Sequence, residues 1–169
     1  MVTRTNGSPM RPDDFKAAFA HLPTAVCVVT AGPATDPAGV TVGTLSPLSL
    51  APPLLMFALK QESRLLHRLR PETVIGLNIL GEGLAEIATR FSRSGDDRFE
   101  GPDWDIEQGP PRLKGVALWM EASVQDRTRF GDHVLVSALL TSAEVGFGRP
   151  LLHWRRAFTQ LAPDAEGVA

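Results

Sequence analysis

The sequence predicts a mainly β protein, a small antiparallel β-barrel with two or three peripheral helices. Short runs rich in valine, isoleucine, leucine and threonine are separated by clusters of glycine, proline and aspartate, which is typical of strands joined by turns. These runs outnumber the helix-like segments and do not alternate with them, as the strands of a parallel sheet would. A chain of 169 residues, 43% of them apolar and 21% charged, suits one compact domain.

The expected strands are short, and turn residues bound each of them. They are residues 24–31, 39–46, 54–59, 73–80, 116–125, 133–145 and 151–161. The first of these, TAVCVVTA, is dominated by β-branched residues, and the turn-rich GPATDPAG follows it. Residues 92–115 are polar and interrupted by glycine and proline. A segment of that length inside a compact domain is more typical of a functional loop than of a linker.

Three segments favour helices. In residues 11–23, RPDDFKAAFAHLP, Asp13 can cap a small amphipathic helix that Pro23 ends. The apolar residues on one face of this helix are Phe15, Ala18, Phe19 and Leu22. Residues 62–71, ESRLLHRLRP, have the length of a short second helix, and residues 84–92, LAEIATRFS, are a third.

Composition excludes several classes of protein. The formal net charge of −2 gives no overall attraction to nucleic acid or to an anionic membrane. The single cysteine, Cys27, excludes an internal disulfide framework and is most simply a small core residue. No apolar run approaches the length of a membrane span, and the first residues lack the apolar segment of a secretory leader. We therefore expect a cytoplasmic protein with one domain at 11–161 and disordered tails at 1–10 and 162–169.

The sequence lacks the residue spacing of three common functional motifs: a dinucleotide-binding fingerprint, a hydrolase nucleophile elbow and a histidine metal site. Gly81 and Gly83 follow a strand in NILGEGLAE, but Glu86 occupies the third glycine position of a dinucleotide-binding fingerprint. No G-x-S-x-G nucleophile elbow accompanies Asp132 and His133, and no H-x-x-x-H pair indicates a metal site. If the protein is an enzyme, this pattern favours a borrowed cofactor.

The best candidate site combines a strand that has small side chains at Gly43 and Thr44 with a polar turn. At Gly43 and Thr44 the strand offers few side-chain obstacles, so a flat ligand could lie against its backbone. Ser63 and Arg64 follow a strand, where a hydroxyl, backbone N–H groups and a guanidinium could together hold a phosphate. Two simpler interpretations stay open: Ser63 is only a helix cap beside a solvated Arg64, and Gly43 marks a barrel corner or bulge.

Several segments, taken in their order, resemble the flavin reductase family of split-barrel flavoproteins. They are FKAAFAHLPTAVCVVTA, GVTVGTLSPLSLAPPLLMFALKQESRLL, VIGLNIL, ATRFS, DRFEGPDW, GPPRLKGVALWMEASV, FGDHVLVSALL and PLLHWRRAF, from Phe15 to Phe158. Members of that family are small NAD(P)H:flavin oxidoreductases that supply reduced flavin to separate monooxygenases or halogenases. The resemblance implies an antiparallel split β-barrel, FMN or FAD as the flavin, NADH or NADPH as the electron donor, and a homodimer.

The resemblance also implies roles for individual residues. One group lines the flavin ring: Thr41, Val42, Gly43, Thr44 and Leu45. A second group approaches the ribityl chain and phosphate or closes on the same side: Leu59, Ser63, Arg64, Arg90 and Phe91. His133, in the Gly131-Asp132-His133 turn, is implied as the catalytic residue that positions the nicotinamide.

The chain also departs from the family pattern. Gly43-Thr44 stands where the family commonly has two serines, or a serine and an asparagine, and Arg155-Arg156-Ala157-Phe158 stands where glycine, arginine and an aromatic residue are frequent. The chain contains no tyrosine. A flavin-binding barrel without reductase activity, such as a carrier, therefore stays an alternative. A barrel that binds single-stranded nucleic acid is a second one, which 7% aromatic residues and a negative net charge disfavour.

Overall fold

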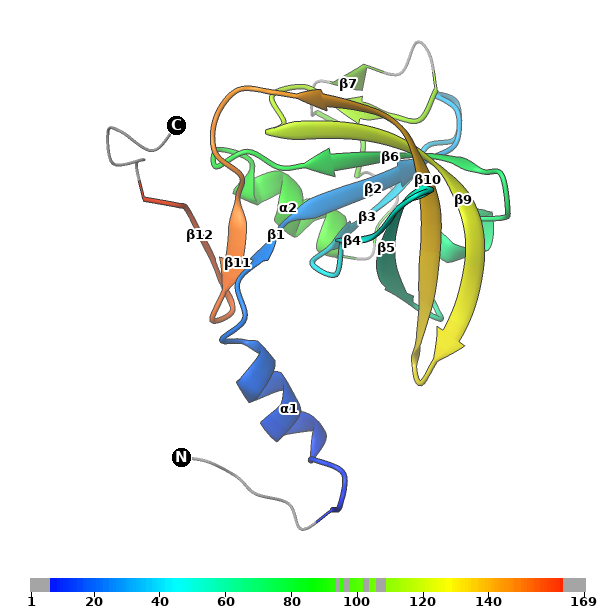
Figure 1. Cartoon of the computed structure of the whole chain (residues 1–169). Helices are drawn as coiled ribbons and strands as arrows, with labels where there is room; N and C mark the ends of the chain where they lie inside the picture. Colours follow the sequence, from blue (N-terminus) through cyan, green and yellow to red (C-terminus); the bar gives the residue numbers. More distant parts are fainter. Residues whose placement is uncertain (1–6, 94, 96–97, 102–103, 106–108, 163–169) are drawn as a thin grey trace.

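A computed structural model describes residues 7–93, 95, 98–101, 104–105 and 109–162. Most of the tails expected at 1–10 and 162–169 lie outside the described residues. The described part of the chain is mainly β, as the sequence predicts, with two α-helices beside the strands (Figure 1). No helix in that part is both long and apolar enough to cross a membrane.

Seven strands form the main sheet, and all neighbours pair antiparallel. Their order is β3 (Ala38–Val42), β2 (Cys27–Ala31), β6 (Val74–Ile79), β9 (Leu118–Phe130), β10 (His133–Val145), β5 (Pro53–Lys60) and β4 (Ser46–Leu50). Figure 1 shows the sheet curling on itself. Within the described residues its two edge strands, β3 and β4, do not pair with each other, so the barrel is split on that side.

Strand β2 lies between two hydrophobic cores. Cys27 and Val29 face the core enclosed by the curled sheet, where Phe57 and Leu77 are also fully buried. Val28 faces the opposite way, into a core that helix α2 (Ala85–Ser92) and the segment after it cover. Every residue of β2 is buried, and all of them except Thr30 are apolar.

The smaller sheets lie at the margins of the barrel. One contains β1 (Thr24–Ala25), β11 (Leu152–Trp154) and β12 (Ala157–Thr159), and the other contains β7 (Trp104–Asp105) and β8 (Arg112–Leu113). Arg155 and Arg156 connect β11 to β12 with φ of 49° and 66°, the conformation of a tight hairpin turn. The RRAF segment therefore forms a hairpin end.

Two buried polar residues fasten the long segment 92–115 to the main sheet. Thr30 Oγ1 donates to the Pro111 carbonyl at 2.7 Å, and Asn78 Oδ1 accepts from the Leu113 N–H at 2.7 Å. Both side chains are fully buried and fully paired, so the cost of burying polar atoms is offset. The end of this segment is thus part of the folded domain and not a linker; its function stays a prediction.

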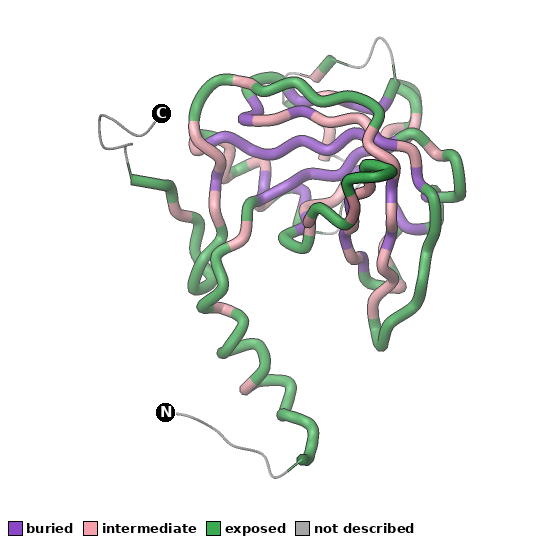
Figure 2. The backbone as a smooth tube through the Cα atoms, in the orientation of Figure 1, coloured by how far each residue is buried: buried purple, intermediate pink, exposed green. Residues whose placement is uncertain are grey.

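The amphipathic helix expected near the N-terminus is α1 (Pro12–Phe19), but Asp13 does not cap it. Arg11 occupies the cap position without a side-chain hydrogen bond, and Pro12 begins the helix because its fixed φ suits a first helical turn. No residue of α1 is buried. Figure 2 shows the helix exposed and standing away from the barrel.

Several expected elements differ in extent. The strand expected at 151–161 is a hairpin of β11 and β12, and the strand expected at 24–31 is broken between Ala25 and Cys27 into β1 and β2. The strand expected at 39–46 ends at Val42, and a separate strand, β4, begins at Ser46. The strand expected at 116–125 continues to Phe130, so only Gly131 and Asp132 form the turn before β10. The helix expected at 62–71 was wrong, because only the short 3-10 helix η1 (Leu66–Arg68) forms there. The Arg70 N–H donates to Thr73 Oγ1 instead of to a helical carbonyl.

Candidate functional site

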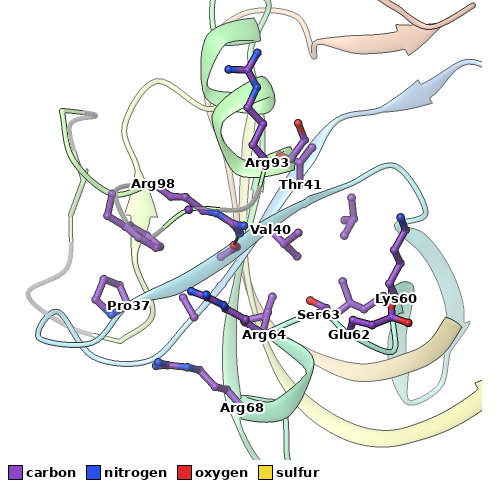
Figure 3. Close-up of a pocket in the computed structure, with 18 of the residues that line it drawn as sticks. Pro37, Val40, Thr41, Lys60, Glu62, Ser63, Arg64, Arg68, Arg93 and Arg98 are labelled. Carbon is purple, nitrogen blue, oxygen red and sulfur yellow. Dashed lines mark hydrogen bonds between the residues drawn. The ribbon is translucent and has the colours of Figure 1, made fainter. Parts of the chain in front are cut away.

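A cavity beside the split of the barrel follows the length of β3. It has a volume of about 860 Å³. Four parts of the chain line it: the segment from Thr35 through β3 to Thr44, the end of β5 with the turn after it from Ala58 to Arg68, the end of α2 with the loop after it from Ser92 to Phe99, and His133 at the start of β10. Figure 3 shows the side chains that converge on it from these elements. A volume of this size is typical of a cofactor or small-molecule site.

The threonines of this wall bind other parts of the protein. Thr41 Oγ1 donates to the Ala88 carbonyl at 2.8 Å and so ties β3 to α2. Thr44 Oγ1 accepts from the Ala58 N–H at 2.9 Å and lies 3.3 Å from the Ala58 carbonyl oxygen. Because both hydroxyls are engaged, the wall presents mainly backbone and aliphatic groups to the cavity.

Gly43 lies at a corner of the barrel, where the chain passes from edge strand β3 toward edge strand β4. A Cβ atom at this position would lie 3.1 Å from Thr24 Oγ1, closer than such contacts normally come. Packing against Thr24 therefore favours glycine here. The structure agrees with the interpretation of Gly43 as a barrel corner, and the same corner lines the cavity. Close approach of a flat ligand at Gly43 stays a prediction.

The polar turn after β5 provides the opposite wall. The Ser63 N–H donates to the Lys60 carbonyl, and the Leu66 N–H donates to the Ser63 carbonyl, at 3.0 Å each. Ser63 is not a helix cap, because Leu65 precedes η1 and no side chain caps it. Ser63 and Arg64 both line the cavity, as Figure 3 shows.

Positive charge predominates in the cavity. Its basic residues are Lys60, Arg64, Arg68, Arg93 and Arg98, against the acidic Asp36 and Glu62. Arg68 donates to the carbonyl and to Oδ1 of Asp36, at 2.8 Å each, and this hydrogen bonding lowers the pKa of the Asp36 carboxyl. Arg98 Nη1 donates to the Gly39 carbonyl at 2.7 Å. The cavity is suited to an anionic ligand.

His133 closes one end of the cavity. Its Nδ1 lies 2.8 Å from Asp132 Oδ1, and the hydrogen bond with His133 lowers the pKa of the Asp132 carboxyl. Gln61 holds this turn from the other strand, because its Nε2 donates to the Gly131 carbonyl at 2.8 Å. The imidazole therefore has a carboxylate neighbour within hydrogen-bonding distance.

The structure brings most of the expected site residues together and leaves three outside the cavity. The residues that line it are Thr41, Val42, Gly43, Thr44, Leu59, Ser63, Arg64 and His133. Leu45 packs against the main core, and Phe91 is fully buried with its ring 5.0 Å from Phe99 and 5.4 Å from Trp104. Arg90 faces a second cavity, described below, and its Nη1 donates to the Glu100 carbonyl.

Several lining residues carried no signal in the sequence. Arg68 looks like a solvated helix residue until the fold brings it to Asp36, and Arg93 and Arg98 belong to a loop whose course no local pattern predicts. Cys27 is buried, and burial raises the pKa of its thiol, so it has the core role expected for it. Among the described residues, histidine, cysteine and carboxylate side chains form no group that could hold a metal ion.

A family model decides the family to which this chain belongs. The model of the flavin reductase like domain matches residues 19–162, which include all of the main sheet and the whole cavity. The chain belongs to the flavin reductase like domain family. The match confirms the resemblance seen in the ordered sequence segments.

Curated members of the flavin reductase like family are similar to this chain over most of its length. An NADH:FMN oxidoreductase of Rhodococcus qingshengii is 36% identical over 130 residues, which are 76% of this chain and 68% of the relative. A flavin reductase (NADH) of Kitasatospora aureofaciens is 30% identical over 154 residues, covering 88% of this chain and 81% of the relative.

Solved structures have the same fold. An NADH:FAD oxidoreductase of Streptomyces globisporus, in complex with NAD and FAD fragments, superimposes with a TM-score of 0.85 and is 26% identical, covering 95% of this chain and all of the other. The styrene monooxygenase flavin reductase of Pseudomonas putida gives a TM-score of 0.79 at 27% identity, covering 89% of this chain and 99% of the other. The mainly β split barrel predicted from the sequence is confirmed.

The cavity fits the flavin expected of a flavin reductase like protein. Its wall along β3 exposes backbone and aliphatic groups, which suit the flat isoalloxazine ring. Its other wall offers the Ser63 hydroxyl and the Arg64 guanidinium, which suit a phosphate. The residues present are thus chemically consistent with FMN or with the corresponding half of FAD.

Proposed function

We propose that this protein uses NADH or NADPH to reduce FMN or FAD and delivers the reduced flavin to a separate monooxygenase or halogenase. The observation that carries the proposal is one cavity that three features line. They are strand β3, which presents mainly backbone and aliphatic groups, the polar turn after β5 with Arg64 and Arg68, and His133. The family and its curated reductases support it. So does the likeness to the reductase component of a 4-nitrophenol monooxygenase of Rhodococcus opacus, which is 28% identical over 155 residues.

The chain's residues divide the work of binding. Thr41, Val42, Gly43 and Thr44 form the wall for the ring, and Leu59 adds an apolar contact. The Ser63 hydroxyl and the Arg64 guanidinium hold the phosphate. Bound flavin supplies the redox chemistry by accepting a hydride from reduced nicotinamide.

His133 positions the nicotinamide substrate. It lies at the end of the cavity and is partly exposed. Its ring contacts Asp132, and Gln61 donates a hydrogen bond to Gly131 of the same turn. A group in this place orients an incoming ring without moving a proton. The absence of a nucleophile or an acid–base pair from the sequence motifs is consistent with this chemistry.

A second copy of the chain covers the apolar face of α1. Phe15 and Phe19 are 50% and 55% exposed, and their rings stack 4.3 Å apart; Leu22, just after the helix, is 56% exposed. A short helix that buries none of its residues gains little stability alone. Packing against the same face of another copy would bury both apolar surfaces, so we propose a homodimer.

An anaerobic mixture of protein, flavin and reduced nicotinamide tests the function. The visible absorbance of oxidised FMN or FAD should bleach at a rate that depends on the concentration of protein, with NADH and NADPH compared in parallel. Bound flavin that neither donor reduces would contradict the proposal and favour a flavin-binding protein without reductase activity.

A further inference from the structure

A second cavity lies beside the first and remains unused by the proposed function. It has a volume of about 870 Å³. One face of α2, with Thr89 and Arg90, forms one wall, and Phe158 of β12 contributes from the other end of the chain. Arg93 and Arg98 line both cavities, so the two hollows adjoin at these guanidinium groups.

The junction between the cavities is suited to bridging phosphates. In Figure 3, Arg93 extends away from Arg64 and Arg68, whereas Arg98 lies across the strand at Val40. Among the described residues, no hydrogen bond or ion pair engages the Arg93 guanidinium. Two arginines that face a shared boundary fit a ligand whose negative charge sits between two larger groups, as a diphosphate does.

The far part of the second cavity is not suited to more negative charge. Glu86 and Glu100 line it beside Arg90, whose Nη1 already donates to the Glu100 carbonyl. Carboxylates accept hydrogen bonds from hydroxyl and amino groups. The Phe158 ring, 38% exposed, offers a face on which a planar base can stack. A neutral nucleoside with donor groups therefore suits this part better than a second phosphate cluster.

We propose that the second cavity binds the adenosine diphosphate half of a dinucleotide, and that this dinucleotide is FAD. The inference rests on the proposed function, which places the flavin ring along β3. NADH carries the same adenosine diphosphate group, but its nicotinamide is assigned to His133. His133 lies directly opposite Lys60 in the pairing of β10 with β5. Figure 3 shows Lys60 across the cavity from Arg98, so the nicotinamide is assigned to the end of the first cavity away from the junction with the second. The second cavity thus makes FAD the preferred flavin over FMN and riboflavin.

Equilibrium titrations without NADH test the preference directly. Flavin fluorescence gives dissociation constants for FAD, FMN and riboflavin with the wild-type protein and with Phe158→Leu, Phe158→Ala and Arg93→Gln. Wild-type protein should bind FAD about tenfold more tightly than FMN, the scale of one base-stacking contact. Each variant should reduce the FAD to FMN affinity ratio severalfold, roughly the loss expected for one stacking or charge-assisted contact.

Two controls separate binding from folding. Arg70→Gln removes one exposed arginine that lines neither cavity, and it should leave the ratio at the wild-type value. Thermal unfolding of each variant identifies a general loss of structure. Arg93 is exposed, so Arg93→Gln keeps the test available even where Phe158→Ala disturbs β12.

The outcomes are distinct. Equal affinity of the wild-type protein for FAD and FMN, or an unchanged ratio in all three variants, would overturn the inference while the reductase activity stood. A raised KM for NADH with FMN as acceptor, at an unchanged FAD to FMN ratio, would assign the cavity to the nicotinamide dinucleotide and overturn its assignment to FAD. A protein that binds no flavin would overturn the proposed function itself.

Discussion

The Thr44 hydroxyl occupies the position that a neighbouring strand would take beside Ala58. Its Oγ1 accepts the Ala58 N–H at 2.9 Å and lies 3.3 Å from the Ala58 carbonyl oxygen, so one side chain meets both backbone groups of a strand residue. Thr44 follows edge strand β3, and Ala58 belongs to β5 near the opposite edge of the sheet. The contact therefore holds the corner of the split barrel that also lines the cavity.

Replacing Thr44 with valine should weaken this corner without changing its shape. Valine keeps the branched volume but loses the hydroxyl, which leaves the Ala58 N–H without this partner. The free energy of unfolding should fall by about 1–2 kcal/mol, and Thr44→Ser should recover most of the loss. Urea denaturation measures both. Equal stability of the valine and serine variants would show that the hydroxyl contributes nothing.

Arg64 should act on the flavin phosphate and not on the ring. Arg64→Ala should raise the dissociation constant of FMN about tenfold, the scale of one charge-assisted contact, and Ser63→Ala should raise it less. Riboflavin lacks the phosphate, so its affinity should change little. Fluorescence titration of both ligands measures the difference, with Arg70→Ala as the matched loss of an exposed arginine. A parallel loss of riboflavin binding would exclude the phosphate role.

His133 should affect the nicotinamide and spare the flavin. His133→Ala should raise the KM for NADH about tenfold, about 1.4 kcal/mol, and leave the flavin dissociation constant within about twofold. Steady-state kinetics at saturating flavin measures the first quantity. A KM equal to that of the wild type would remove His133 from the nicotinamide site.

Asp132 should act through His133 as a positioning residue. Asp132→Asn retains a hydrogen-bonding side chain but removes the carboxylate charge, so it should produce a smaller increase in the KM for NADH than His133→Ala. Adding Asp132→Asn to His133→Ala should have almost no further effect, because the two side chains work as one unit. Additive effects in the double variant would contradict the coupling that the 2.8 Å contact indicates.

The sequence predicted the parts of this fold that local chemistry determines. The β-branched run around Cys27 forms β2, and α2 begins within two residues of its expected start. The helix expected at 62–71 is replaced by the short η1: the Arg68 side chain bonds to Asp36 across the fold, and the Arg70 N–H bonds to Thr73 Oγ1 in a local turn. The contact with Asp36 joins residues 32 positions apart, so no local pattern contains it.

The candidate site likewise contains residues that local sequence patterns indicate and residues that only the fold brings together. The sequence indicated Gly43, Ser63 and His133 as candidate site residues. Gly43 interrupts a strand-like run, Ser63 belongs to a polar turn after a strand, and His133 follows the Gly131-Asp132 turn. Phe91 also seemed part of the site, yet it packs beneath the cavity, and a Cβ on Gly39 would come within 2.9 Å of its ring. Successive side chains of an α-helix point about 100° apart around its axis, so the position of Phe91 in a site motif does not place its ring in the cavity.

The homodimer should depend on the apolar face of α1. Phe15→Ser combined with Phe19→Ser removes two exposed rings that support no core, so the barrel should remain folded while the dimer dissociates. Light scattering after size exclusion should give twice the 18.2 kDa chain mass for the wild type and a single chain mass for the double variant. Phe147→Ser, at a fully exposed ring outside α1, is the matched control and should stay dimeric. A monomeric wild type, or a double variant that stays dimeric, would exclude this face as the interface.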